Sequence, residues 1–270
     1  MLEVLKNTTY RHLFLAQVIA LIGTGLITIA LALQAYDIAK GEAAQVLGIA
    51  LAIKMIAYIG VAPIASAFAE RLPRKKVLVG LDIIRALTAL CLPFVTQIWQ
   101  IYILIFILQS ASAAFTPTFQ AMIPDVLPEE KDYTNALSLS RLAYDLENII
   151  SPMLAGFLLG FISYHNLFLG TVIGFIGSAL FVVSAKLPAA KVPVFKGVYY
   201  RIKQGTKIYF NTPRLKALLA LNLAIASASA VVIVNTVVLV QTTFGLTEKA
   251  TTWAFGLFGL GIAKPNVSPF

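Results

Sequence analysis

Residues 66–85 read SAFAERLPRKKVLVGLDIIR, and this stretch decides how the chain folds. It leaves one apolar segment, passes through the basic turn PRKK at 73–76, and enters a second apolar segment. The second segment carries Asp82 and Arg85, and charges in hydrocarbon are costly unless they pair or line a working path. The stretch therefore predicts two membrane-spanning helices that are joined by a short basic turn.

Composition points to the same environment. The chain has 270 residues, of which 59% are hydrophobic and 12% are charged, and its mean hydropathy is +0.85. A soluble domain has about a quarter charged residues, so these values indicate a membrane protein. The net charge of +9 does not predict nucleic-acid binding, because the basic residues are spread between apolar runs. The single cysteine, Cys91, excludes an internal disulfide, and we expect it to be buried.

Hydrophobic runs predict seven full spans, because a helix needs about 20 apolar residues to cross a bilayer. An eighth run begins near Thr251 and stops after about 13 apolar residues at Lys264 and Pro265, which is too short to cross. The seven predicted spans are Leu13–Tyr36, Val46–Ala69, Val77–Val95, Ile98–Met122, Ala136–Phe161, Leu167–Leu187 and Leu215–Val240.

The connections between these spans alternate in charge. One set contains 16 of the 21 Lys and Arg residues, whereas the other contains only Lys40 and Lys249. The positive-inside rule therefore places the N-terminus and the basic connections in the cytoplasm. The single long connection follows six spans, as in proteins built from two half-bundles. We expect three parts: a six-helix half-bundle at 1–187, a cytoplasmic basic linker at 188–214, and the incomplete start of a second half-bundle at 215–270.

Three motifs in order resemble the Major Facilitator Superfamily, and within it the macrolide-efflux and siderophore-exporter branch. The turn after the second span is similar to the family signature G-x-x-x-D-R-x-G-R-[RK], with Ser66 and Glu70 in place of Gly and Asp. The second motif is the exit from the fourth span, PTFQAMIP at 117–124. The third is SPMLAG at 151–156, which resembles the antiporter motif of the fifth span.

The resemblance implies an all-α membrane protein: a six-helix N-terminal half-bundle of a Major Facilitator fold, with a seventh span and a partial eighth. It also implies a multi-pass protein of a bacterial-type cytoplasmic membrane, with small-molecule substrate, protons and the lipid bilayer as partners. The family has about twelve spans, so we expect this chain to be truncated. The resemblance further assigns a gating role to one group of residues, in which Asp125 is the expected partner of Arg74: Ser66, Glu70, Arg71, Arg74, Lys75 and Asp125.

Intramembrane charges give further candidates. Asp82 and Arg85 are three residues apart on one helix face, so we interpret them as a structural ion pair. Lys54 lies near the middle of the second span, where it would bind an anionic substrate or pair with Asp37.

The fifth span supplies carboxylates and a bend. Glu147 is the first candidate for a proton carrier, with Asp145 beside it, and the alternative for Glu147 is an interfacial carboxylate paired with Arg141. Pro152 bends a helix, and the small residues that follow it would let spans five and eight approach closely. The residues of this antiporter-like motif are Ser151, Pro152, Ala155 and Gly156.

These features favour a secondary transporter that exports amphipathic small molecules by proton-coupled alternating access. No nucleotide-binding P-loop, metal-ligand cluster or nucleophile–base arrangement is visible, so we expect neither an enzyme nor a cofactor. The alternative is a truncated fragment of such a transporter that does not transport.

Overall fold

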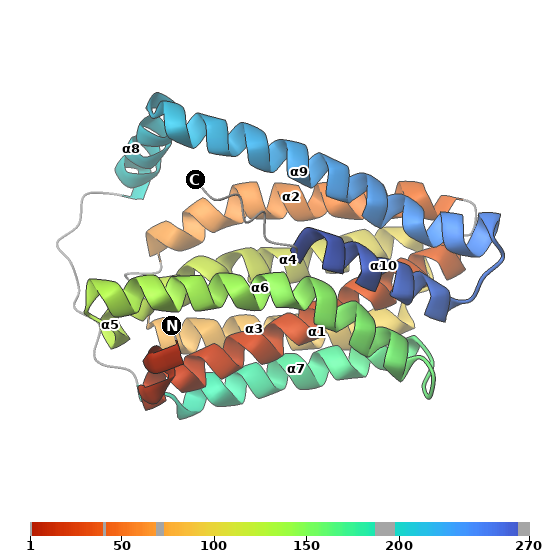
Figure 1. Cartoon of the computed structure of the whole chain (residues 1–270), viewed down its shortest axis with the longest axis horizontal. Helices are drawn as coiled ribbons and strands as arrows, with labels where there is room; N and C mark the ends of the chain where they lie inside the picture. Colours follow the sequence, from red (N-terminus) through yellow and green to blue (C-terminus); the bar gives the residue numbers. More distant parts are fainter. Residues whose placement is uncertain (1, 40–41, 69–72, 187–197, 264–270) are drawn as a thin grey trace.

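The computed structural model describes residues 2–39, 42–68, 73–186 and 198–263, and within these ranges the chain is all-helical (Figure 1). This confirms the predicted fold class. A long helix follows each of the seven apolar runs that were predicted to span a membrane. The elements are η1 (Leu2–Lys6), α1 (Thr8–Ala39), α2 (Ala43–Phe68), α3 (Arg74–Cys91), η3 (Leu92–Phe94), α4 (Ile98–Gln120), α5 (Ile123–Val126), α6 (Glu130–Leu158), α7 (His165–Ser184), α8 (Val198–Asn211), α9 (Pro213–Val238), η4 (Leu239–Thr243) and α10 (Glu248–Ala263).

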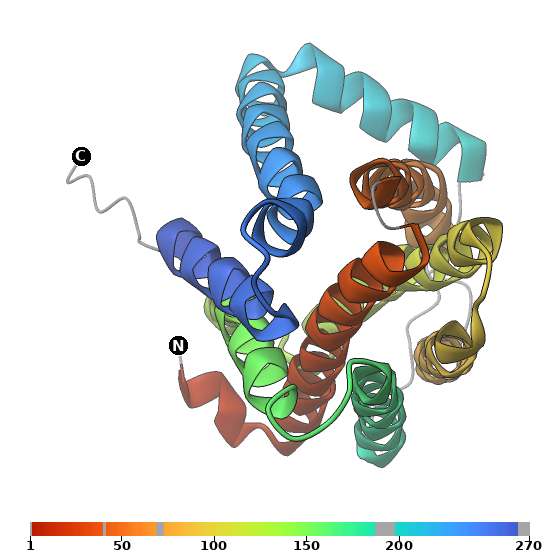
Figure 2. The same cartoon turned by 90° about the vertical axis from the view of Figure 1, so that its right-hand side faces the viewer.

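The long helices run side by side along the longest axis of the molecule, and α8 is turned across it (Figures 1 and 2). The helices α1, α3, α6 and α9 begin at one end of this bundle, which also holds α5 and α8. Arg74, Lys75 and Lys76 lie at the same end, and we call it the basic end. The helices α2, α4, α7 and α10 begin at the opposite end.

Six of the described helices are long and apolar enough to cross a membrane: α1, α2, α3, α4, α7 and α9. The predicted fifth span is the 29-residue helix α6, which runs alongside them but carries Arg141, Asp145 and Glu147. These charges explain why α6 is less apolar than its neighbours. The last helix, α10, has 16 residues, which is shorter than the roughly 20 that a crossing needs.

Helix α1 packs against α7 at very short range. A Cβ atom added to Gly174 would lie 3.1 Å from the Cα atom of Gly23, and one added to Gly23 would lie 3.2 Å from the Thr171 carbonyl oxygen, so a side chain at either position would push the two helices slightly apart. The Thr171 hydroxyl uses this approach to donate a hydrogen bond of 2.9 Å to the Gly23 carbonyl oxygen. Small residues permit such backbone contact between membrane helices.

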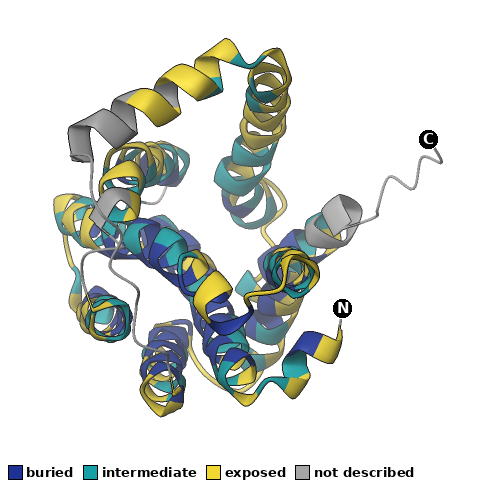
Figure 3. Cartoon of the chain, turned by 90° about the vertical axis from the view of Figure 1, so that its left-hand side faces the viewer, coloured by how far each residue is buried: buried dark blue, intermediate teal, exposed yellow. Residues whose placement is uncertain are grey.

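Burial differs sharply among the helices, and α2, with 11% of its most apolar window buried, is almost as exposed as α9. In the most apolar window of α1, 61% of the residues are buried, against 6% in α9 (Figure 3). Helix α9 therefore presents its apolar side chains outward, as a helix in contact with lipid does. Cys91, which we expected to be buried, is exposed at the end of α3.

Candidate functional site

A cavity of about 530 Å³ lies among α1, α2, α4 and α6, and residues of α9 and α10 close one side of it. Most of its wall is apolar, including Leu31, Leu47, Ile105 and Phe115. Aliphatic and aromatic walls with a few polar groups are typical of small-molecule sites. The charged residues that line the cavity are Lys54, Arg85, Arg141, Asp145 and Glu147.

Lys54 on α2 and Glu147 on α6 face the cavity from different helices. Their charges lie close enough to attract each other. The structure places Arg141 against Asp145 instead, with 3.3 Å between Nε and Oδ1, so Arg141 is not the partner of Glu147. The expected alternative partner of Lys54, Asp37, accepts a hydrogen bond from Tyr164.

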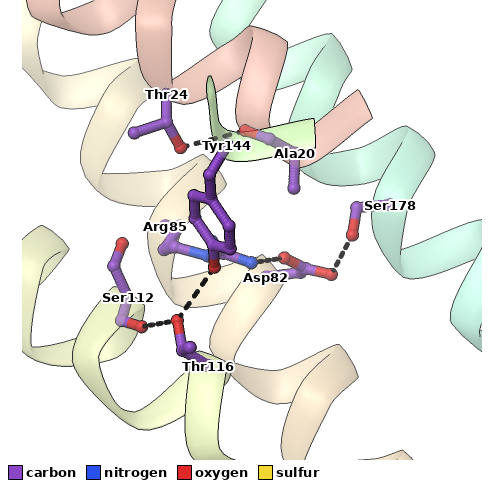
Figure 4. A network of polar contacts seen from close by, with 8 residues as sticks. All are labelled: Ala20, Thr24, Asp82, Arg85, Ser112, Thr116, Tyr144 and Ser178. Carbon is purple, nitrogen blue, oxygen red and sulfur yellow. Dashed lines mark hydrogen bonds and ion pairs between the residues drawn. The ribbon is translucent and has the colours of Figure 1, made fainter. Parts of the chain in front are cut away.

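Asp82 and Arg85 form an ion pair beside the cavity, with side chains that are 0% and 4% exposed (Figure 4). Ser178 on α7 donates a hydrogen bond of 2.8 Å to Asp82 Oδ2. The guanidinium carbon of Arg85 lies 4.1 Å from the ring centre of Phe115 and 4.6 Å from that of Phe175. Cation–π contacts of this kind stabilise a desolvated arginine. The pair therefore joins α3 to α4 and α7, and Arg85 also reaches the cavity wall.

Arg74 and Asp125 form an ion pair at the basic end, and Arg74 also donates a hydrogen bond of 2.7 Å to the Ala121 carbonyl oxygen. The neighbouring Lys75 donates to the Ala185 carbonyl oxygen over 2.9 Å. Together these contacts tie the start of α3 to the end of α4 and the end of α7. Ser66 is exposed near the end of α2. Glu70 and Arg71 lie outside the described residues, and their gating role stays a prediction.

The antiporter-like motif places α6 against α10. Pro152 lies inside α6, and Ser151, Pro152, Ala155 and Gly156 are all buried. A Cβ atom at Gly156 would lie 2.6 Å from Thr252 Oγ1 on α10, and one at Gly256 would lie 3.5 Å from Met153 Cγ. The two helices thus meet through small residues, as expected for spans five and eight. The hydroxyl of Ser151 is buried and has no hydrogen-bond partner among the described residues.

Sequence reasoning missed several polar residues of the cavity. Tyr58 follows Lys54 by one helical turn, and Tyr144 precedes Glu147 by one turn, so helical spacing would have found both. The Tyr144 hydroxyl lies 3.3 Å from Thr116 Oγ1, which links α6 to α4 (Figure 4). Gln17 accepts a hydrogen bond of 3.0 Å from Ser140, and the 123 positions that separate them leave no local signal. In the part of the chain that is described, no three His, Cys, Asp or Glu residues are placed to hold a metal ion.

Comparison with known proteins identifies relatives for most of the chain. Residues 13–266 match the Major Facilitator Superfamily. The sequence is 24% identical over 205 residues to the uncharacterized MFS-type transporter YfiS of Bacillus subtilis (strain 168), which covers 74% of this chain and 49% of YfiS. It is 25% identical over 177 residues to macrolide efflux protein A of Streptococcus pyogenes, which covers 64% of this chain and 43% of that protein.

Macrolide efflux protein A of Enterococcus faecalis is 26% identical over 150 residues, which covers 54% of this chain and 46% of that protein. The chain thus spans about half the length of the curated relatives it matches.

Two solved structures share the fold. The nucleoside transporter NupG superposes with a TM-score of 0.73 at 15% identity, over 93% of this chain and 64% of NupG. A bacterial homolog to the human lysosomal transporter Spinster, in an inward-facing and unoccupied conformation, superposes with a TM-score of 0.72 at 12% identity, over 94% of this chain and 59% of that chain.

Proposed function

The chain belongs to the Major Facilitator Superfamily of membrane transporters, and from this premise we propose that it serves proton-coupled export of amphipathic small molecules. In this proposal, substrate binds in the cavity among α1, α2, α4 and α6, and rocking of two half-bundles exposes the cavity to either side of the membrane in turn. No enzymatic step is involved, because members of this family transport and do not transform their substrates.

The cavity is the observation that carries the proposal. Its volume of about 530 Å³ lies within the range of about 300–1,000 Å³ that is usual for sites of drug-sized ligands. Apolar walls favour the hydrophobic part of an amphipathic molecule, and the polar groups of α2 and α6 provide contacts for its polar part. The similarity to two proteins named macrolide efflux protein A supports a bulky amphipathic substrate.

Glu147 is the proposed proton carrier. Lys54 is the proposed group whose electrostatic environment changes when Glu147 gains or loses a proton. When Glu147 is ionised, its carboxylate neutralises the charge of Lys54 across the cavity. When Glu147 takes up a proton, the cavity gains one net positive charge and the Lys54 ammonium becomes free to bind an acceptor group. Proton exchange at one carboxyl therefore changes the affinity of the cavity for a charged or polar substrate.

The basic end is the proposed cytoplasmic end, because it holds the connections that are rich in Lys and Arg. In this orientation, the Arg74–Asp125 ion pair and the hydrogen bond from Lys75 brace the cytoplasmic ends of α3, α4 and α7. We assign them, with Ser66, Glu70 and Arg71, to a gate that loosens during the transport cycle. Residues 151–156 form the proposed hinge at which α6 meets α10. We place the protein in a bacterial cytoplasmic membrane.

Reconstitution of the purified chain into liposomes tests this function. Uptake of a radiolabelled macrolide is measured with an imposed proton gradient, and proton movement is followed with a pH-sensitive dye inside the vesicles. We expect Glu147→Gln to abolish proton movement that depends on substrate. Glu130→Gln is the matched control, because Glu130 is an exposed carboxylate of the same helix that does not line the cavity.

The outcomes separate the alternatives. Unchanged coupling in Glu147→Gln contradicts the role of Glu147 but leaves an exporter in place. Absence of gradient-driven uptake for a panel of amphipathic compounds favours the alternative of a transport-incompetent fragment. That alternative has one specific observation behind it, since the chain spans about half the length of its curated relatives.

A further inference from the structure

Helix α8 differs in direction from every long helix of the bundle. Figure 1 shows the long helices along the horizontal axis, and Figure 2, turned by 90°, shows α8 from the side while the bundle helices are seen nearly end-on. It lies at the rim of the basic end. Within the described residues, its main contacts are with α2 and α9. If the long helices cross a bilayer, α8 lies parallel to the membrane plane.

The segment around α8 carries an unbalanced positive charge. Residues 186–216 contain eight Lys and Arg residues and no Asp or Glu, and no acidic residue occurs anywhere between Glu147 and Glu248. By contrast, the other basic connections contain carboxylates, such as Asp125 beside Arg74. The charge of 186–216 therefore has no anionic counterpart within its own part of the sequence.

The cations of α8 and of the first turn of α9 whose side chains the structure describes are exposed and have no ion-pair partner in the described residues. Lys207 on α8, and Arg214 and Lys216 in the first turn of α9, make no ion pair there. The positive end of the α9 dipole adds to the charge of Arg214 and Lys216, because cations are favoured at the C-terminus of a helix and not at its start. An external anion at this position would pair with these cations and would interact favourably with the positive end of the α9 dipole.

Geometry identifies the kind of anion. Arg214 and Lys216 begin the 26-residue apolar helix α9, so they lie at the level where the hydrocarbon of a bilayer ends. Tyr209 shortly precedes them, and tyrosine side chains favour this interfacial level. Helix α8, which carries Lys207, lies in the same plane at the rim, and the residues that line the central cavity include none of α8.

We propose that α8 and the first turn of α9 form a binding surface for the headgroups of anionic phospholipids, with Lys207, Arg214 and Lys216 as its described cations. Clusters of Lys and Arg next to a spanning helix attract anionic lipid, and the attraction is screened within a Debye length. The lipid would hold the linker between the two halves of the fold at the membrane surface. This inference does not depend on the proposed transport function.

A fluorescence experiment on the full chain tests the surface. Asn211→Cys, at the exposed end of α8, is labelled with bimane in a Cys91→Ser background, and the protein is reconstituted into vesicles of phosphatidylcholine and phosphatidylglycerol. The nitroxide quencher is placed near the glycerol of one lipid or the other, so that the overall composition stays the same. The comparison reports which lipid surrounds α8.

We expect quenching by labelled phosphatidylglycerol to be at least about twice the quenching expected if lipids surrounded α8 in proportion to their mole fractions. This excess should disappear when the salt concentration rises from about 0.05 M to about 0.5 M. The triple variant Lys207→Gln, Arg214→Gln, Lys216→Gln should lose this excess. Lys6→Gln is the matched control, since Lys6 is an exposed cation of the same end that already pairs with Glu3 at 3.5 Å.

Three results would overturn the inference. One is quenching of the original sequence in proportion to mole fraction, and another is an excess that persists in the triple variant. The third is an absence of quenching by either lipid, which would mean that protein and not lipid covers α8. The salt series needs no substitution of a basic residue, so it decides the matter even if the triple variant misfolds.

Discussion

The hydroxyl of Tyr164 donates a hydrogen bond of 2.7 Å to Asp37 Oδ2, and this contact ties the start of α7 to the end of α1. The two residues are 127 positions apart in the sequence. The Tyr164 ring also lies against the ring of His165 in a tilted arrangement, with 4.1 Å between ring centres, and Tyr164 is 8% exposed. Burial, and then the bond to Asp37, raise the pKa of the Tyr164 hydroxyl, so it remains a donor at every working pH.

Tyr164→Phe removes this hydrogen bond and keeps the ring. Hydrogen bonds to charged groups contribute about 1.5–3 kcal/mol, so we expect the free energy of unfolding to fall by about that amount. Thermal unfolding in detergent measures the change. Tyr133→Phe is a control, because Tyr133 belongs to the same residue type and no side-chain hydrogen bond is found for it in the described part of the chain. Equal losses in both variants would contradict a specific role of the contact.

Glu248 on α10 gives the same end of the bundle a dependence on pH. Partial burial raises the pKa of its carboxyl, the neighbouring Asp37 carboxylate raises it further, and His165 acts in the opposite direction. A carboxyl whose folded-state pKa is raised binds its proton more tightly when folded. Its contribution to stability is therefore complete below the unfolded pKa and is lost as pH rises through the raised value.

We expect the unfolding temperature of the original chain to fall as pH rises through this window, relative to Glu248→Gln. The variant keeps the shape of the side chain but cannot ionise, so its curve lacks this contribution. The difference between the two curves isolates Glu248 from Asp37 and His165, which both proteins retain. A constant difference across the titration would show that Glu248 has the same pKa in the folded and unfolded states.

The buried ion pair of Asp82 and Arg85 predicts strong non-additivity. Removal of one partner leaves an uncompensated buried charge, so Asp82→Asn and Arg85→Met should each lower stability by about 3–5 kcal/mol. The double variant Asp82→Asn, Arg85→Met removes both charges and should cost less than the sum of the two. A double-mutant cycle of unfolding free energies measures the coupling. Additive losses would mean that the cation–π contacts of Arg85 outweigh its ion pair.

The long helices and the Asp82–Arg85 pair were predictable from the sequence because they depend on local features. Apolar runs of membrane length define the helices, and a spacing of three residues places two charges on one face. That Lys54 and Glu147 line one cavity was not predictable, because they lie on different helices and only packing brings α2 and α6 to the same space. The direction of α8 depends likewise on packing against α2 and α9, for which the sequence of α8 gives no local signal.

The close approach of α1 to α6 beside the cavity gives the last prediction. A Cβ atom at Gly25 would overlap the Cβ and Oγ atoms of Ser151, and it would lie 3.6 Å from Glu147 Cγ. Gly25→Ala must therefore displace α6 at the position of the proposed proton carrier. Overpacking of this kind costs about 1–3 kcal/mol, and we expect both stability and proton coupling to decline.

Two further variants separate the clash from helix propensity. Gly48→Ala is the matched control, since a Cβ atom there meets nothing within 4 Å and alanine favours a helix by about 1 kcal/mol. It should leave the unfolding temperature unchanged or raise it. Ser151→Gly removes the atoms that the added methyl group would strike, so it should restore coupling when combined with Gly25→Ala. If the double variant is no better than Gly25→Ala alone, Ser151 is not the obstacle, and the position of Glu147 must depend on other contacts of α6.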